Sequence, residues 1–252
     1  MANHERYILS SPKTMAEAGY LSGTASVVRE LIRQQFGALL GECAIASRTA
    51  MAVLGEGISG PPHQRVALAA WQRSICACQA AVLLAERGMV VEAASILRTG
   101  FEHLFYARAL LVDPGVLERM RDQDTYERQH TVRQALADTD IGNAVSAEQR
   151  AALEAVLQQP VGNLRISAYG AAEKGGLAAV YQVAYRQLSL VGTHANYTSI
   201  GASFGDSADE LQFEQRIDDL PVVLRLIRDC LKLGSEAFLT LQTQTDEARP
   251  TI

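Results

Sequence analysis

Apolar residues recur along this chain at the three- and four-residue steps of amphipathic helices, and no series of strand-like alternation interrupts them. Glycine and proline mark the breaks between helices, most clearly at residues 55–62 and 113–115. Ser146 is placed to cap a short helix, and a helical turn is expected near Ser167. Pro221 should kink or split the last helix. The pattern predicts helices over residues 14–53, 63–87, 90–112, 116–137, 147–158, 177–191 and 208–243.

This succession predicts an all-α fold, a single helical bundle of six to eight helices. The chain has 252 residues, of which 48% are hydrophobic, enough for a substantial core. We expect residues 1–60 to form an N-terminal arm and a long helix that packs on the core. Residues 61–252 should form the bundle core and carry a polar site.

The segment 90–112 is an apolar helix with one narrow polar edge. Its polar residues Ser95, Arg98, Thr99, Glu102 and Tyr106 fall within an arc of about 100°. This edge either faces water or lines an internal site. Arg98 and Glu102 stand four residues apart and can pair directly. The pair is either an internal salt bridge between helices or a site in which Arg98 binds an anion.

A second polar edge lies in the segment 180–197. If the helix continues, one edge carries six polar residues: Gln182, Tyr185, Arg186, Ser189, Thr193 and Asn196. His194 would lie about 120° from the middle of that edge, unless Gly192 ends the helix and a turn returns it. If the two edges face each other, a shared pocket would collect Arg98, Glu102, Tyr106, Tyr185, Ser189 and His194.

Two functions fit this pocket. In an enzyme, the catalytic residues would be Arg98, Glu102 and His194, with Arg98 or Arg186 holding phosphate and His194 acting as acid and base. The substrate-binding residues would then be Tyr106, Tyr185, Arg186, Ser189 and Asn196. In a non-catalytic module, the same edges would hold a small anion or a metal ion, or lock a helix interface.

The composition of the chain limits which partners and cofactors it is expected to bind. The net charge of −5 argues against a surface that is basic throughout, so RNA or a small anionic ligand would need a local site. The four cysteines complete no zinc spacing, and Glu127-x-x-His130 has no second copy for a paired-metal bundle. No cofactor is expected, although a divalent metal held by carboxylate and histidine stays open. No signal peptide or membrane span is recognised, so we expect a cytoplasmic protein that forms a homo-oligomer, a dimer.

Several short motifs resemble those of one family. Arg87-Gly88, the Arg98-x-x-x-Glu102 helix, and the Tyr185-x-x-x-Ser189 helix with its following His194 resemble the helical domain-of-unknown-function family 5677. The likeness covers about residues 78 to 200 and implies a helical fold without a known activity.

A weaker resemblance is to HEPN-type ribonucleases, helical dimers with four to six residues between an arginine and a histidine. Arg98 and His103 have four residues between them and fit that count. Arg186 and His194 have seven and depart from it. The resemblance implies a nuclease of bacterial defence or stress type.

Overall fold

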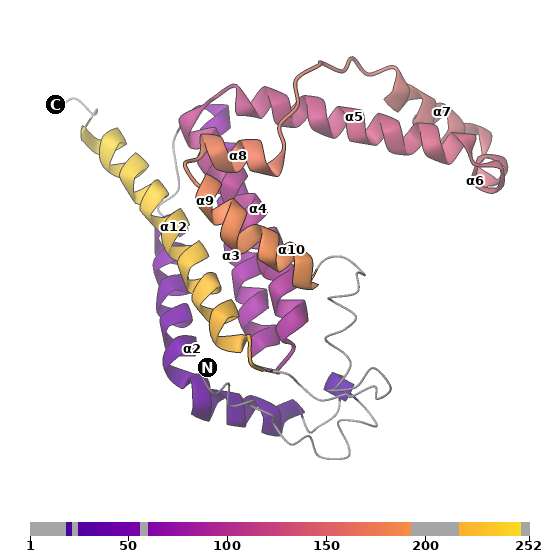
Figure 1. Ribbon diagram of the computed structural model, residues 1–252. Coiled ribbons are helices and arrows are strands. Elements are labelled where there is room, and N and C mark those ends of the chain that lie inside the picture. Colours follow the sequence, from indigo (N-terminus) through magenta and orange to yellow (C-terminus); the bar gives the residue numbers. More distant parts are fainter. Residues whose placement is uncertain (1–18, 22–24, 56–59, 193–216, 248–252) are drawn as a thin grey trace.

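The structure, a computed structural model, describes residues 19–21, 25–55, 60–192 and 217–247. Every regular element in these ranges is a helix, which confirms the all-α prediction. Four long helices form the bundle: α2 (Ala25–Gly55), α3 (Pro62–Ala85), α4 (Val90–Val112) and α12 (Leu220–Glu247). Helix α4 packs against α3 and α12, and α2 packs along α12 (Figure 1). Helix α4 therefore has a central place in the bundle.

Close approaches between helices set the packing of the core. The Ser74 hydroxyl on α3 donates to the carbonyl of Gly100 on α4 at 2.8 Å, where glycine leaves room for the neighbouring helix. One turn earlier on α3, the Trp71 ring stacks on Phe238 of α12 with centroids 6.1 Å apart. Gly234 of α12 lies directly against the same indole ring. Small residues at these crossings bring large apolar side chains into contact.

Helix α2 is bent, and its first half is tied to the α3–α4 turn. The backbone at Phe36, next to Gly37, leaves helical geometry. Before the bend, the guanidinium groups of Arg29 and Arg33 both bind the carboxylate of Glu86, at 2.8 and 3.0 Å. Glu86 is buried, so the two arginines compensate a charge that burial alone would disfavour.

A second run of helices lies against α4. It consists of α8 (Ala168–Lys174), α9 (Ala178–Val180), the π-helical turn η2 (Tyr181–Tyr185) and α10 (Arg186–Gly192). In Figure 1 the orange ribbon of α9 and α10 follows the side of α4. The last three elements occupy the range in which the sequence predicts one helix, 177–191.

Helices α5 (Val116–Ala137), α6 (Thr139–Ala144) and α7 (Ala147–Leu157) project away from the bundle (Figure 1). Helix α5 buries only Val116, Gln129 and Val132, and Gln129 joins α5 to the end of α7 by donating to the Gln159 carbonyl at 2.7 Å. Ser146 caps α7 as predicted, within a capping box with Gln149.

The last helix was predicted over residues 208–243, with a split or kink at Pro221. In the described residues it begins at Leu220, so Pro221 lies in its first turn. Proline is compatible with a first turn because its missing N–H would have no partner there. Helix α6 was not predicted, because its six residues show too little periodicity to be recognised.

Two helices, α2 and α3, are long and apolar enough by length and composition to cross a membrane. Both also supply buried residues to the bundle core, and a core helix meets the same criterion. This composition is therefore weak evidence for a membrane, and the cytoplasmic location stays a prediction.

Candidate functional site

The two polar edges predicted from the sequence meet between α4 and the antiparallel helix η2–α10. The Ser95 hydroxyl donates to the Gly192 carbonyl. The next contact along α4 is from Arg98 Nε to Ser189 Oγ, at 2.8 Å. One turn further, the Tyr185 hydroxyl donates to Glu102 Oε2 at 2.9 Å. Each step of three or four residues along α4 thus matches an equal step back along its partner, which is the register of an antiparallel pair.

Arg98 is the centre of this network. Besides its bond to Ser189, its Nη1 donates to Glu102 Oε2 at 3.2 Å. Its guanidinium carbon lies 4.5 Å from the centroid of the Tyr185 ring, within the range of a cation–π contact. Ser189 in turn donates its hydroxyl proton to the Tyr185 carbonyl, at 2.8 Å. We call Arg98, Glu102, Tyr185 and Ser189 the α4–α10 network.

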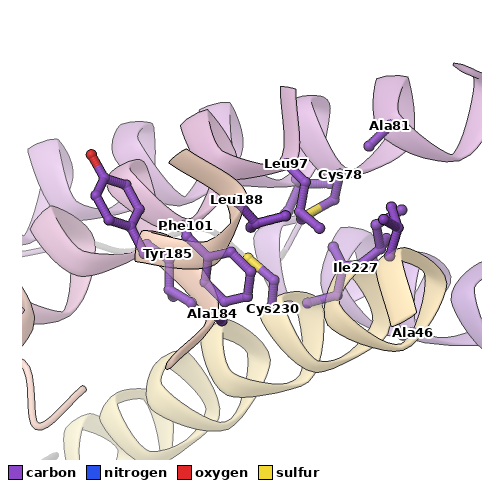
Figure 2. Close-up of a cluster of buried hydrophobic side chains, with 14 of the residues drawn as sticks. Ala46, Cys78, Ala81, Leu97, Phe101, Ala184, Tyr185, Leu188, Ile227 and Cys230 are labelled. Carbon is purple, nitrogen blue, oxygen red and sulfur yellow. The ribbon is translucent and has the colours of Figure 1, made fainter. Parts of the chain in front are cut away.

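The network lies at the border between core and solvent. The Arg98 side chain is 22% exposed and that of Glu102 is 34% exposed, whereas Tyr185 is buried. In Figure 2 the Tyr185 ring borders a cluster that includes Phe101 and Leu188, and its hydroxyl points away from that cluster. Burial and the bond to Glu102 raise the pKa of Tyr185 above its ordinary value, which keeps the hydroxyl protonated as a donor.

Two polar atoms of the network have no hydrogen-bond partner among the described residues. Within the described ranges, neither Arg98 Nη2 nor Glu102 Oε1 makes a hydrogen bond. A donor and an acceptor are therefore both available at one half-exposed place. This pair of atoms gives the network a binding capacity beyond its role in joining two helices.

Two of the remaining predicted site residues, Tyr106 and Arg186, do not join the network. Tyr106 lies one turn beyond Glu102, and its hydroxyl donates to the Ile166 carbonyl at 3.1 Å. Burial raises the pKa of Tyr106 to about 12. Arg186 is exposed and donates to Gln182 on its own helix. The Tyr106 hydroxyl therefore does not meet Arg98 as expected, because it has a backbone partner, and the exposed Arg186 lies outside the network. His194 and Asn196 lie outside the described residues.

Arg98 and His103 fit the HEPN count but lie on different sides of α4. Five helical steps place them about 140° apart. Arg98 turns toward α10, whereas the half-buried His103 feels the charge of Arg73 on α3. Burial and that guanidinium lower the pKa of His103 below its ordinary value. This pair therefore does not gather both side chains at one point.

Two features that hold the network were not predicted from sequence. One is the π-helical turn η2, which ends at Tyr185 and which no residue pattern marks. The other is the close approach at Gly192, where a Cβ would lie 2.9 Å from the Ser95 backbone nitrogen. The sequence carried a signal for the second, since a glycine followed the polar edge, but it was interpreted as a helix end.

No three-residue group of histidine, cysteine, aspartate or glutamate that could hold a metal occurs in the part of the chain that the structure describes. The carboxylate of Glu127 accepts a hydrogen bond from Gln123, and His130 stacks on Tyr126 with centroids 6.1 Å apart. Cys43, Cys78 and Cys230 are buried and Cys76 is exposed, all as free thiols. Burial raises the pKa of Cys43 to about 11, which keeps this thiol protonated.

Comparison with known families supplies the identity. The model of a family of unknown function, DUF5677, matches residues 64–211, more than half of the chain. The chain belongs to the DUF5677 family. The match includes α4 and α10, and so the whole α4–α10 network lies inside the family's domain. Searches of curated proteins and of solved structures find no match. The resemblance to HEPN ribonucleases is supported by no match.

Proposed function

We propose that this DUF5677 chain is a binding module that holds a small anionic ligand at the α4–α10 network. The observation that supports it is the pair of open atoms, Arg98 Nη2 and Glu102 Oε1, on side chains that are otherwise fixed. A ligand that satisfies both atoms needs an anionic acceptor beside a hydrogen-bond donor. A protonated phosphate group, free or in a phosphate monoester, carries both.

The contacts favour binding over catalysis. The Ser189 hydroxyl donates to the Tyr185 carbonyl and accepts from Arg98, so no base among the described residues withdraws its proton. An activated nucleophile requires such a base within hydrogen-bond distance. The carboxylate of Glu102 accepts hydrogen bonds from two donors, Arg98 and Tyr185. The network is therefore arranged to hold charge in place.

The test is an NMR-detected titration with inorganic phosphate at about pH 6, where a phosphate group is largely protonated, at constant ionic strength. We expect a saturable site beside α4 and α10 whose affinity falls at least tenfold in Arg98→Met. Arg128→Met is the matched control, because Arg128 is an exposed arginine paired with Asp124 on one helix. Acetate, which has no donor, should not occupy this site. Phosphate shifts that are equal in Arg98→Met and in the wild type would refute the proposal.

A ribonuclease is the second candidate. The exposed guanidinium of Arg186 on α10 favours it, since it is accessible to a phosphate of RNA and precedes His194 in the chain. A HEPN-like enzyme of this kind would act as a homodimer. RNA cleavage by the purified protein should then disappear in His194→Ala and in Arg186→Met. Equal residual cleavage in the wild type and His194→Ala would reject this candidate.

A further inference from the structure

Arg108 is a charged residue on an apolar face of α4. It follows Phe101 by seven residues, two helical turns, and so continues the side of the helix that Leu97 and Phe101 bury in the core. Arg108 itself is half-buried. A guanidinium in such a place is costly unless it is paired and hydrogen-bonded.

Arg108 has no such partner in the described residues, and this sets it apart. The other half-buried arginines there all bind an acceptor: Arg29, Arg87, Arg98, Arg119, Arg150 and Arg228. The one charge that acts on Arg108 is Glu236 of α12, which forms neither a hydrogen bond nor an ion pair with it. Burial lowers the pKa of Arg108 relative to an ordinary arginine, although the group stays charged.

The turn between α8 and α9 packs directly on Arg108. A Cβ at Gly175 would lie 2.8 Å from Arg108 Cβ, and one at Gly176 would lie 4.0 Å from its Nη2. Gly176 has φ +71°, a conformation that other residues rarely adopt. Because neither turn residue has a side chain, neither can supply a charge that neutralises the guanidinium.

We propose that Arg108 binds an oxyanion, a phosphate or carboxylate group, beside the Gly175–Gly176 turn. The planar fork of a guanidinium presents two parallel N–H donors that match the oxygens of such a group. The ligand would supply the acceptor that every comparable arginine in the described chain already has. This site is separate from the α4–α10 network and does not depend on it.

The two sites differ in the ligands that they accept. Arg108 bonds to no acceptor in the described residues, and the proposed contact needs only oxygens from the ligand, so acetate as well as phosphate should bind there. The α4–α10 network should accept protonated phosphate and reject acetate. A titration with acetate therefore tests the Arg108 site alone.

The experiment titrates the full chain with sodium acetate, and separately with inorganic phosphate, at constant ionic strength and with NMR detection. We expect saturable shifts at the α8–α9 turn, at least tenfold weaker in Arg108→Met and unchanged in Arg128→Met. Arg108→Lys keeps the charge but loses the fork, so its affinity should lie between those of the wild type and Arg108→Met. Glu236→Gln removes a repulsive charge and should strengthen binding several-fold.

Three outcomes would overturn the inference: no saturable shift at the turn, equal affinity in Arg108→Met and the wild type, or unchanged affinity in Glu236→Gln. In the first two cases the guanidinium only extends its stem over the core and meets water. Arg98→Met should leave acetate binding intact. Failure of the proposed function and failure of the Arg108 proposal can thus be told apart, because acetate binding tests the Arg108 site alone.

Discussion

Replacing Arg98 with methionine should destabilise the fold by about 2 kcal/mol. Methionine keeps the apolar stem and removes the guanidinium. The charged hydrogen bond to Ser189 accounts for about 1 kcal/mol, below the range for a charged bond because the side chain is 22% exposed. The contact with the Tyr185 ring contributes about 0.5–1 kcal/mol. The ion pair with Glu102 contributes about 0.5 kcal/mol, because water screens a pair this exposed.

Urea denaturation of the wild type and Arg98→Met measures the difference, which corresponds to a fall in melting temperature of about 4–8 °C. Arg128→Met should change the unfolding free energy by less than about 0.5 kcal/mol. A double-mutant cycle with Ser189→Ala should show a coupling of about 0.5–1 kcal/mol, because the two side chains share a hydrogen bond. A loss below about 0.5 kcal/mol in Arg98→Met, or strict additivity in the cycle, would show that the network does not hold α10 on α4.

Substitutions at Gly234, Glu86 and His103 test other parts of the structure. Gly234→Ala places a Cβ inside the Trp71 ring and should cost about 1–3 kcal/mol in urea unfolding, whereas Gly37→Ala meets no atom and should not destabilise the fold. Glu86→Gln leaves the two arginines of α2 facing a neutral amide and should lower the free energy of unfolding by about 3 kcal/mol. A decrease of less than about 1 kcal/mol would show that these ion pairs do not hold α2 on the α3–α4 turn. Because the pKa of His103 is lowered in the fold, the unfolded chain binds a proton at this histidine more readily than the folded chain does. The contribution of neutral His103 to the unfolding free energy is therefore full above about pH 6.5. It is lost as the pH falls through the pKa of His103 in the folded chain. Unfolding midpoints from pH 8 to pH 5 should fall less in His103→Gln than in the wild type, and parallel curves would exclude the effect.

Most of the helices were predictable because their signals are local. Val90–Val112 and Val116–Ala137 have the predicted bounds, since Gly88 and the sequence Asp113-Pro114-Gly115 terminate periodic apolar patterns. Contacts across the bundle carry no such signal. Nothing near Glu86 in the sequence names its partners on α2, more than fifty residues away.

The α4–α10 network was predictable only in part, because the sequence carries local signals and none for contacts between helices. Periodicity placed Arg98 and Glu102 on one edge and Tyr185 and Ser189 on another, and the structure brings the two edges together. Periodicity also placed Tyr106 and Arg186 on those edges, but it does not say where each edge stops facing its partner. Periodicity also places Arg108 off the polar edge, but it does not show that Arg108, unlike the other half-buried arginines of the described residues, bonds to no acceptor.

The π-helical turn explains how a residue of the core can also serve the polar network. A π-helix turns less per residue than an α-helix, so residues four apart fall nearly above each other. Tyr181 and Tyr185 accordingly stack, with ring centroids 4.8 Å apart, and both rings contact Phe105 on α4. The turn therefore places two aromatic rings on one side of the helix, and Tyr185 can fill the core with its ring while its hydroxyl reaches Glu102. Single π turns recur at functional sites, and this one lies where the apolar packing of α4 meets its polar edge.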